Sequence, residues 1–209
     1  MKGILFTPDN IRAIAEGRKT VTRRVIKPTR ATEWLLCGDW ADDYIKDPGN
    51  DLIKSARYQV SEVVYIKEAH YAYGHWTQFN EEGKSHWEFF RDKETPIHFA
   101  DTEWTHALTK PSNKEGWYKR SPLFLEEKFA RYFIKILDVR HERLQEITEE
   151  NAVAEGIVPV WADGTPIRHD GTGAICIEAY TKLWDSINPK YPWSSNPWVW
   201  RYEFEKVEK

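Results

Sequence analysis

Eight residues near the N-terminus, 17–24, carry the side chains best suited to chemistry. They read Gly-Arg-Lys-Thr-Val-Thr-Arg-Arg, which places four cations and two hydroxyls between two apolar stretches. Like charge and burial would both lower the pKa of Lys19, because each disfavours its charged form. A neutral amine can accept the proton of Thr22 and activate that oxygen as a nucleophile. Lys19 and Thr22 are therefore a candidate base and nucleophile, although charge alone favours a solvated basic turn.

Glu155 is the second candidate. Thr148 is a hydroxyl N-cap and Gly156 a C-terminal signal, which together predict a helix over about 149–155. A carboxyl group in the last turn faces the negative end of the helix dipole, so its charged form is disfavoured. Such a group can stay partly protonated and act as a general acid. The simpler interpretation is an ordinary exposed helix glutamate.

The elements around the basic stretch decide whether its residues can meet. Pro8 at the first helical position and Gly17 after the last predict a helix over about 8–16. A strand should follow over 19–26, where β-branched residues recur. In a straight strand Lys19 and Thr22 point to opposite faces. They can meet only if Lys19 still lies in the turn, or if a bulge intervenes.

The remaining elements are few and do not alternate regularly. Strands are expected over about 2–6, 58–69, 97–101, 129–139 and 198–204, and a third amphipathic helix carries Ile175, Ala179, Leu183 and Ile187. Loop-rich insertions occupy about 27–56, 70–122 and 158–173. This order predicts an α+β fold, a small mixed β-barrel with flanking helices in a single domain spanning 1–209.

Composition excludes several functional classes. The formal net charge of -3 gives no global positive field, so nucleic acid could be attracted only by a local patch. Two distant cysteines and no signal-peptide or membrane pattern predict a reducing, cytoplasmic setting without a membrane partner. The histidines lack zinc-site spacing and there is no phosphate-binding fingerprint, so no metal or cofactor is expected. The eleven tryptophans could fill a core or stack on bases.

Four segments together resemble the ASCH domain family, a branch of the PUA-like superfamily. The first is Gly17-x-Lys19-x-x-Thr22-x-Arg24, and the second is the strand region 58–69. The others are the helix region 144–156 and the closing segments 184–188 and 196–200, which resemble larger, phage-associated members. One departure is Ser61, because the family usually has glycine in that turn. The resemblance spans nearly the whole chain and implies a PUA-like barrel.

The resemblance also implies roles for individual residues. Small members of the family include an amidohydrolase that removes the acetyl group from N4-acetylcytidine. Its Lys-Thr-Glu set corresponds to Lys19 as proton acceptor, Thr22 as nucleophile and Glu155 as proton donor. Four further residues would bind substrate, namely Arg18, Arg23, Arg24 and Glu68.

Three functions follow as hypotheses. The first is hydrolysis of an amide on a modified nucleoside or base, the second is RNA or modified-base binding without turnover, and the third is a ribonuclease. The insertions are absent from small family members, so the substrate can differ from free N4-acetylcytidine. The sequence does not specify the oligomeric state.

Overall fold

The structure is a computed structural model that describes residues 1–27, 51–81, 83–100, 107–158 and 175–209. The chain divides into two compact units, which we describe separately. The hairpin unit comprises residues 1–8 and 64–133, and the helical unit comprises residues 9–63 and 134–209. Most of the insertions predicted over 27–56 and 158–173 lie outside the described residues. In the described part of the chain, no helix is long and apolar enough to cross a membrane.

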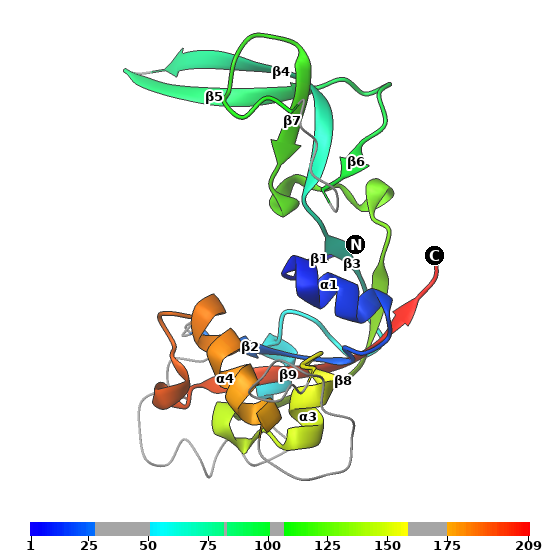
Figure 1. The fold of residues 1–209 in the computed structure, drawn as a ribbon, viewed down its shortest axis with the longest axis vertical. Helices are drawn as coiled ribbons and strands as arrows, with labels where there is room; N and C mark the ends of the chain where they lie inside the picture. Colours follow the sequence, from blue (N-terminus) through cyan, green and yellow to red (C-terminus); the bar gives the residue numbers. More distant parts are fainter. Residues whose placement is uncertain (28–50, 82, 101–106, 159–174) are drawn as a thin grey trace. The chain divides into compact units, whose positions relative to one another are not determined.

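In the described residues, the helical unit combines the α-helices α1, α3 and α4 with a sheet (Figure 1). Its strands are neighbours in the order β8-β9-β2. Strand β2 runs antiparallel to β9, from the pair Val21 and Glu203 to the pair Val25 and Val199. The elements of this unit are α1 (Pro8–Ala15), β2 (Val21–Val25), η2 (Asp51–Ser55), β8 (Phe133–Arg143), η5 (Leu144–Glu146), α3 (Glu149–Ala154), α4 (Ile175–Ile187), η6 (Trp193–Ser195) and β9 (Trp198–Val207).

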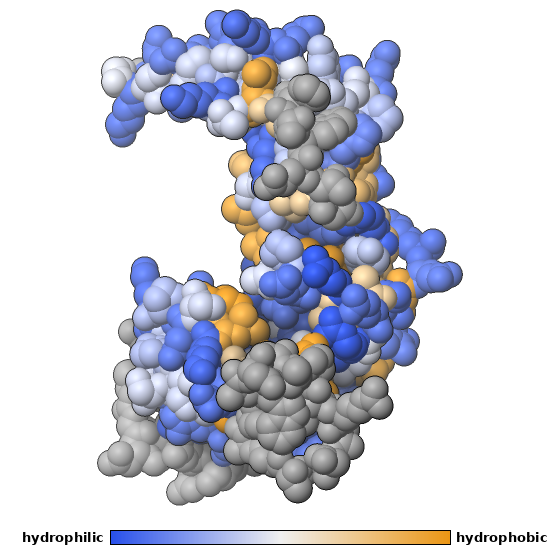
Figure 2. All heavy atoms as spheres, in the orientation of Figure 1, coloured by the Kyte–Doolittle hydropathy of each residue, from blue (hydrophilic) through white to orange (hydrophobic). Residues whose placement is uncertain are grey.

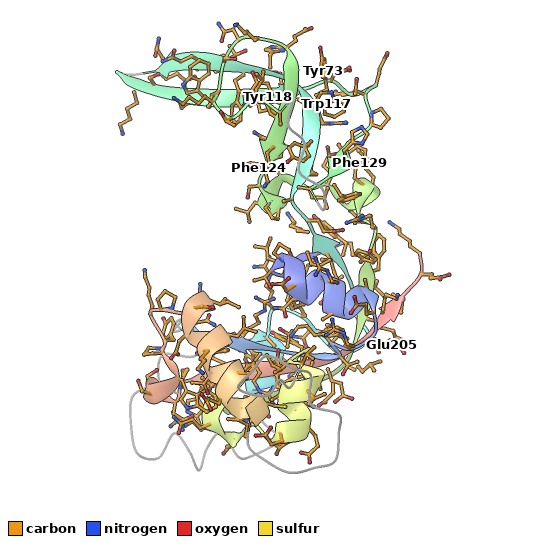
Figure 3. The ribbon with its side chains drawn as sticks, in the orientation of Figure 1. Tyr73, Trp117, Tyr118, Phe124, Phe129 and Glu205 are labelled. Carbon is orange, nitrogen blue, oxygen red and sulfur yellow. The ribbon has the colours of Figure 1, made fainter. Side chains whose placement is uncertain are left out.

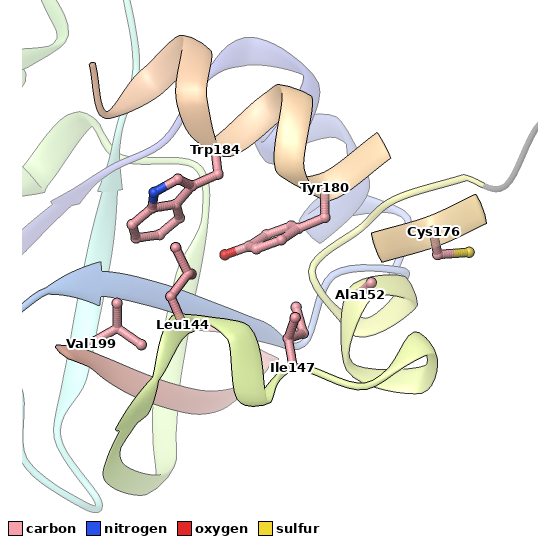
Figure 4. Packing of buried hydrophobic residues seen from close by; sticks show 7 residues of the cluster. All are labelled: Leu144, Ile147, Ala152, Cys176, Tyr180, Trp184 and Val199. Atoms are coloured by element: carbon pink, nitrogen blue, oxygen red, sulfur yellow. The ribbon is translucent and has the colours of Figure 1, made fainter. Parts of the chain in front are cut away.

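The core of the helical unit lies between α4, α3 and the sheet. Tyr180 and Trp184 extend from α4, and Leu144 and Val199 meet them from η5 and β9 (Figure 4). All four side chains are at most 3% exposed. Burying aromatic and aliphatic side chains of this size supplies the main driving force for folding. This packing also holds α4 where its polar side chains can reach the end of α3.

The hairpin unit is built on the long strand β4. It pairs with β7 along one edge and with β5 and β6 along the other, and β1 pairs in parallel with β3. Alternate residues of β4 face opposite sides of the sheet. Its elements are β1 (Gly3–Leu5), β3 (Val63–Lys67), β4 (His70–Glu81), β5 (Lys84–Arg91), β6 (His98–Phe99), β7 (Gly116–Arg120), η3 (Pro122–Phe124) and η4 (Glu127–Phe129).

Aromatic rings line both faces of this hairpin sheet. On one face Tyr73 packs edge-on against Trp117 with ring centroids 5.6 Å apart, and both are labelled in Figure 3. On the other face Trp76 and Phe89 pack around Tyr118. The outer end of the hairpin is mostly hydrophilic at its surface (Figure 2). Residues 70–122, expected to be a loop-rich insertion, therefore supply most of the hairpin unit's sheet.

The α+β class is confirmed, but the expected closed barrel is wrong for the described residues. The sheets are open, and β2 is the last strand of its sheet. The chain just before β2 pairs with the end of a helix, because the Thr20 amide donates to the Ala154 carbonyl at 2.9 Å. The backbone groups that could have extended β2 into a closing strand are therefore used by α3.

The three predicted helices are confirmed with small shifts at their ends. Thr148 is the N-cap of α3 and accepts from the Asn151 amide, and Glu155 is its C-cap. The predicted strand at 129–139 starts later, at Phe133, because Glu127–Phe129 forms a 3-10 turn. Ser61 has a positive φ of 69°, so this turn keeps the left-handed conformation without glycine.

Candidate functional site

The turn after α1 determines where Lys19 lies. Gly17 has a φ of 76°, and its amide donates to Ile14 while the Arg18 amide donates to Ala13. This pair of hydrogen bonds is the Schellman motif, which ends a helix and reverses the chain. The Lys19 amide also donates to Ala13, at 3.1 Å. Lys19 is therefore part of the turn rather than of β2, one of the two arrangements that the sequence allowed.

Lys19 is joined to Glu155 by both backbone and side chain. The two residues form an isolated antiparallel bridge. The Lys19 ammonium Nζ lies 2.5 Å from Glu155 Oε2 and 2.7 Å from the Glu155 carbonyl oxygen. Their side chains are only 2% and 5% exposed. The structure thus brings together two of the three predicted catalytic residues in a closed environment.

Burial changes the proton affinity of Lys19. Desolvation is the largest effect and lowers its pKa, and the charges of Arg24 and Arg23 act in the same direction. The attraction and hydrogen bond of Glu155 oppose that shift without reversing it. The expected lowering of the lysine pKa is therefore present. It arises mainly from removal of water and only secondarily from like charge.

Arg23 supplies a second cation to the same carboxylate. Its Nη1 lies 3.1 Å from Glu155 Oε1, and its Nε lies 2.6 Å from Glu142 Oε1. Tyr180 adds a hydroxyl 3.4 Å from Glu155 Oε1. Burial is the main cause that raises the pKa of Tyr180 well above its ordinary value, so this phenol stays protonated and donates. The Glu155 carboxylate thus accepts from Lys19, Arg23 and Tyr180.

Thr22 is buried but stands apart from this network. It is 4% exposed and lies opposite Tyr202 on β9. Within the described residues its side chain makes no hydrogen bond to Lys19 or Glu155. Because side chains alternate along a strand, Thr22 faces away from Arg23, the neighbour that binds Glu155. The predicted nucleophile therefore lies on the opposite side of β2 from the Arg23 contact.

Two of the expected substrate-binding residues, Arg18 and Glu68, are engaged elsewhere. Arg18 is exposed and pairs with Glu16, with Nη2 and Oε2 2.5 Å apart. Glu68 belongs to the hairpin unit and binds Arg131 through two hydrogen bonds of 3.2 and 2.7 Å. The Arg18 guanidinium also donates to the carbonyl oxygen of Gly156, the residue after Glu155, at 3.3 Å, but within the described residues it makes no hydrogen bond to the Glu155 carboxylate.

Arg24 lies on the opposite side of β2 from Arg23. It is partly buried on the strand face that also carries Thr22. Desolvation lowers its pKa, and Tyr58 is the group that most strongly offsets this effect. An arginine remains protonated in such surroundings. The region around Glu155 therefore holds three cations, Lys19, Arg23 and Arg24, against the two carboxylates Glu155 and Glu142.

Sequence reasoning missed Glu142 and Tyr180. Glu142 lies near the end of β8, beyond the predicted strand, and Tyr180 lies beside the apolar stripe that predicts the third helix. A hydroxyl on an otherwise apolar helix face was the available signal, because a buried phenol needs a hydrogen-bond partner. Among the described residues, no group of three or more His, Cys, Asp or Glu side chains is placed to hold a metal ion.

Comparisons with known proteins do not extend this description. No protein-family model, no curated protein and no solved structure matches the chain.

Proposed function

We propose that this chain is an ASCH-type hydrolase that cleaves an amide on a modified nucleoside or base. The observation that carries the proposal is the buried Lys19–Glu155 pair, with 2.5 Å between Nζ and Oε2 and a lowered lysine pKa. A lysine that loses its proton easily can serve as a base at neutral pH. The adjacent carboxyl can receive that proton and return it to a leaving amine.

The proposed reaction balances through this pair. The Thr22 hydroxyl, which makes no hydrogen bond to Lys19 here, must first come within reach of Nζ when substrate binds. Its oxygen then attacks the acyl carbon, and its proton passes to Lys19 Nζ and across the short contact to Glu155. The carbon–nitrogen bond breaks as Glu155 delivers that proton to the departing nitrogen. Water then attacks the acyl-threonine ester, gives one proton back to Thr22 and releases the carboxylic acid. The three cations around the site would favour the oxyanion that develops on the acyl oxygen.

The experiment is hydrolysis of N4-acetylcytidine, with cytidine and acetate followed by chromatography. Lys19→Met and Glu155→Gln should each lower kcat about 10²–10⁴-fold, the usual contribution of a positioned acid or base. The exposed pair Lys182 and Glu178 on α4 supplies matched controls. Lys182→Met and Glu178→Gln should leave the rate unchanged. Wild-type activity in Lys19→Met would remove the proposal.

Thr22→Val tests the covalent step separately, because valine keeps the volume and removes the hydroxyl. Loss of activity supports Thr22 as nucleophile. Retained activity would show that the Lys19–Glu155 pair activates water directly. A mass increase of one acetyl group on wild-type protein, absent in Thr22→Val, would identify the acyl-enzyme.

Binding of RNA or a modified base without turnover is the second candidate. The observation that favours it is that, within the described residues, the Thr22 hydroxyl has no hydrogen bond to Lys19 or Glu155 that could activate it as a nucleophile. Such binding would weaken steeply as salt rises, because phosphate contacts release counterions. An affinity that does not change between low and moderate salt would argue against this candidate.

A further inference from the structure

Arg120, at the end of β7 in the hairpin unit, is held in a cage of aromatic rings. Its guanidinium carbon lies 4.6 Å from the ring centroid of Trp76, 4.2 Å from that of Phe89 and 4.6 Å from that of Phe124. The residue is only 8% exposed. Aromatic faces attract a cation, but they accept none of the five N–H bonds of a guanidinium well.

This buried charge has no counter-ion in the described part of the chain. No carboxylate or carbonyl oxygen there accepts from the Arg120 side chain. Desolvation lowers the pKa of Arg120, and no acid offsets it. A buried arginine without a partner is costly, because its lost hydration is not replaced.

The residue paired with Arg120 across the sheet does not compensate its charge either. His70 lies opposite Arg120 in the sheet and is 4% exposed. Burial is the main cause that lowers the pKa of His70, and the charge of Arg120 lowers it further. The residue opposite Arg120 in the sheet is therefore uncharged at neutral pH and supplies no anion.

A second donor in the same cage also lacks an acceptor. The indole Nε1 of Trp76 is buried, and no residue that the structure describes accepts a hydrogen bond from it. An unsatisfied buried N–H group is rare in folded proteins and calls for an explanation such as a bound ligand or ion. Here it belongs to the ring that packs directly on the unpaired guanidinium. The Arg120 guanidinium and the Trp76 indole N–H are thus two donors in the same cage without an acceptor among the described residues.

On the side formed by η3, the aromatic cage around Arg120 borders on solvent. Phe124 is 61% exposed and is labelled in Figure 3 near the end of β7. Its neighbour Leu123 is 59% exposed, and the Lys67 ammonium binds the Leu123 carbonyl at 2.7 Å. One side of the cage is therefore a single exposed ring with a cation beside it. We expect a ligand to approach Arg120 from this side by displacing the Phe124 ring.

We propose that Arg120 and Trp76 Nε1 form a binding site for a phosphate group in the hairpin unit. The guanidinium fork can engage two phosphate oxygens in parallel, and the indole N–H can reach a third. A carboxylate has only two oxygens, so the indole N–H would have to share one that the guanidinium fork already engages. The phosphate can belong to a free phosphate compound or to the backbone of a nucleic-acid strand, since both present the same oxygens.

The test uses the full chain labelled with nitrogen-15. Each tryptophan gives one indole signal, and the Trp76 signal is identified by its loss in Trp76→Phe. Inorganic phosphate should shift that signal in a saturable way, whereas sodium chloride at equal ionic strength should not. Sodium acetate should bind at least about tenfold more weakly, because one charge-assisted hydrogen bond has to share an acceptor oxygen and is weakened.

Two variants separate binding from packing. Arg120→Met should abolish the phosphate-dependent shift. Trp76→Phe keeps an aromatic wall and removes only the N–H, so phosphate affinity, followed by its effect on the melting temperature, should fall about tenfold. A short single-stranded oligothymidylate distinguishes the two sources. Tighter binding than inorganic phosphate identifies a nucleic-acid backbone, and equal or weaker binding identifies a free phosphate compound.

Three results would overturn the proposal. The first is a Trp76 signal that does not respond to phosphate, which would mean that a water molecule or packing alone satisfies the cage. The second is an unchanged shift in Arg120→Met. The third is acetate binding as tightly as phosphate, which would make the site a carboxylate site.

Discussion

At the residue scale, Glu155 is the point on which three donors converge from three elements. Lys19 comes from the turn after α1, Arg23 from β2 and Tyr180 from α4. Removing one member of such a buried ionic group leaves the others without compensation. The contacts proposed for acid–base chemistry therefore also stabilise the fold locally. Their effects on reaction rate and on the free energy of unfolding can be measured separately.

Lys19→Met, Glu155→Gln and the double variant form a thermodynamic cycle. Each single change should lower the free energy of unfolding by about 3–5 kcal/mol, because it leaves a buried charge unpaired. The double variant should lose clearly less than the sum. Urea unfolding measures all three. The exposed Lys182–Glu178 pair, treated in the same way, should show a coupling of only about 0.3–0.5 kcal/mol. Additive losses at Lys19 and Glu155 would contradict the description of the pair.

The lowered pKa of Lys19 predicts a pH dependence with a definite sign. Between the folded pKa and the unfolded value of about 10.4, the unfolded chain binds more protons at this residue. The contribution of Lys19 to stability must therefore rise as pH increases towards that value. The free energy of unfolding of wild type minus that of Lys19→Met should grow from pH 8 to pH 10. Tyr180 and Tyr202, whose raised pKa values act oppositely, are present in both proteins and largely cancel. A difference that shrinks with pH would contradict the lowered pKa.

At the element scale, two glycines end the helices that carry the site. Gly17 follows α1 and Gly156 follows α3, with φ values of 76° and 90°. Only glycine adopts this region without strain. The two glycines differ in how much room a side chain would have. An added Cβ at Gly17 meets nothing within 4 Å, whereas at Gly156 it would approach Ala13 and Lys19 at 3.0 and 3.1 Å.

Alanine at these positions should therefore have unequal effects. Gly17→Ala should cost about 1 kcal/mol, which is the conformational strain alone. Gly156→Ala should cost at least about 1 kcal/mol more, because it also crowds the base of Lys19. Thermal unfolding compares them, and Gly17→Asn should recover part of the first loss, since asparagine tolerates this conformation. Equal losses would mean that the turn around Lys19 is looser than described.

Most elements of the helical unit could be predicted because their signals are local. Proline at N1, the threonine N-cap and the terminal glycines each act within one turn of helix, and α1 and α3 begin and end close to those residues. The hairpin sheet was missed for the opposite reason. Its aromatic residues lie on both faces, so the alternation of apolar and polar residues that marks a half-buried strand is obscured.

At the scale of the whole molecule, Cys176 reports on opening of the packed core. It is 6% exposed at the start of α4, and burial raises its pKa to about 11. The reactive form of a cysteine is the thiolate, which is scarce at pH 8 under these conditions. Labelling therefore requires the helical unit to open around α4.

In a Cys37→Ser background, Cys176 should react with a thiol reagent at pH 8 at least about 10³ times more slowly in the native protein than in urea. Mass spectrometry over time gives both rates. Glu155→Gln should accelerate the native reaction, because it destabilises the unit that contains Cys176. Similar native and unfolded rates would show that α4 is not packed as described.

The sequence by itself determined the chemical candidates and the short-range structure. The motif at 17–24 identified Lys19 and Thr22, and the capping signals placed Glu155 at a helix end. Strand alternation in the sequence also required Lys19 to lie in the turn, or a bulge to intervene, if Lys19 and Thr22 were to meet. The Schellman turn fulfils the first requirement, because it keeps Lys19 out of the strand. The inferences about the helix ends and the turn are confirmed, and they depend on residues that are neighbours along the chain.

The tertiary structure alone decided which residues meet. Glu155 lies 136 residues from Lys19 and 132 from Arg23, so no local pattern could specify their contacts. The fold then joined Arg23 to the pair and directed Thr22 to the other face of β2. The same holds in the hairpin unit, where Arg120 and Trp76 meet within one aromatic cage. Side-chain partners at such separations depend on strand register and helix packing, which arise only when distant segments bury their apolar surfaces together.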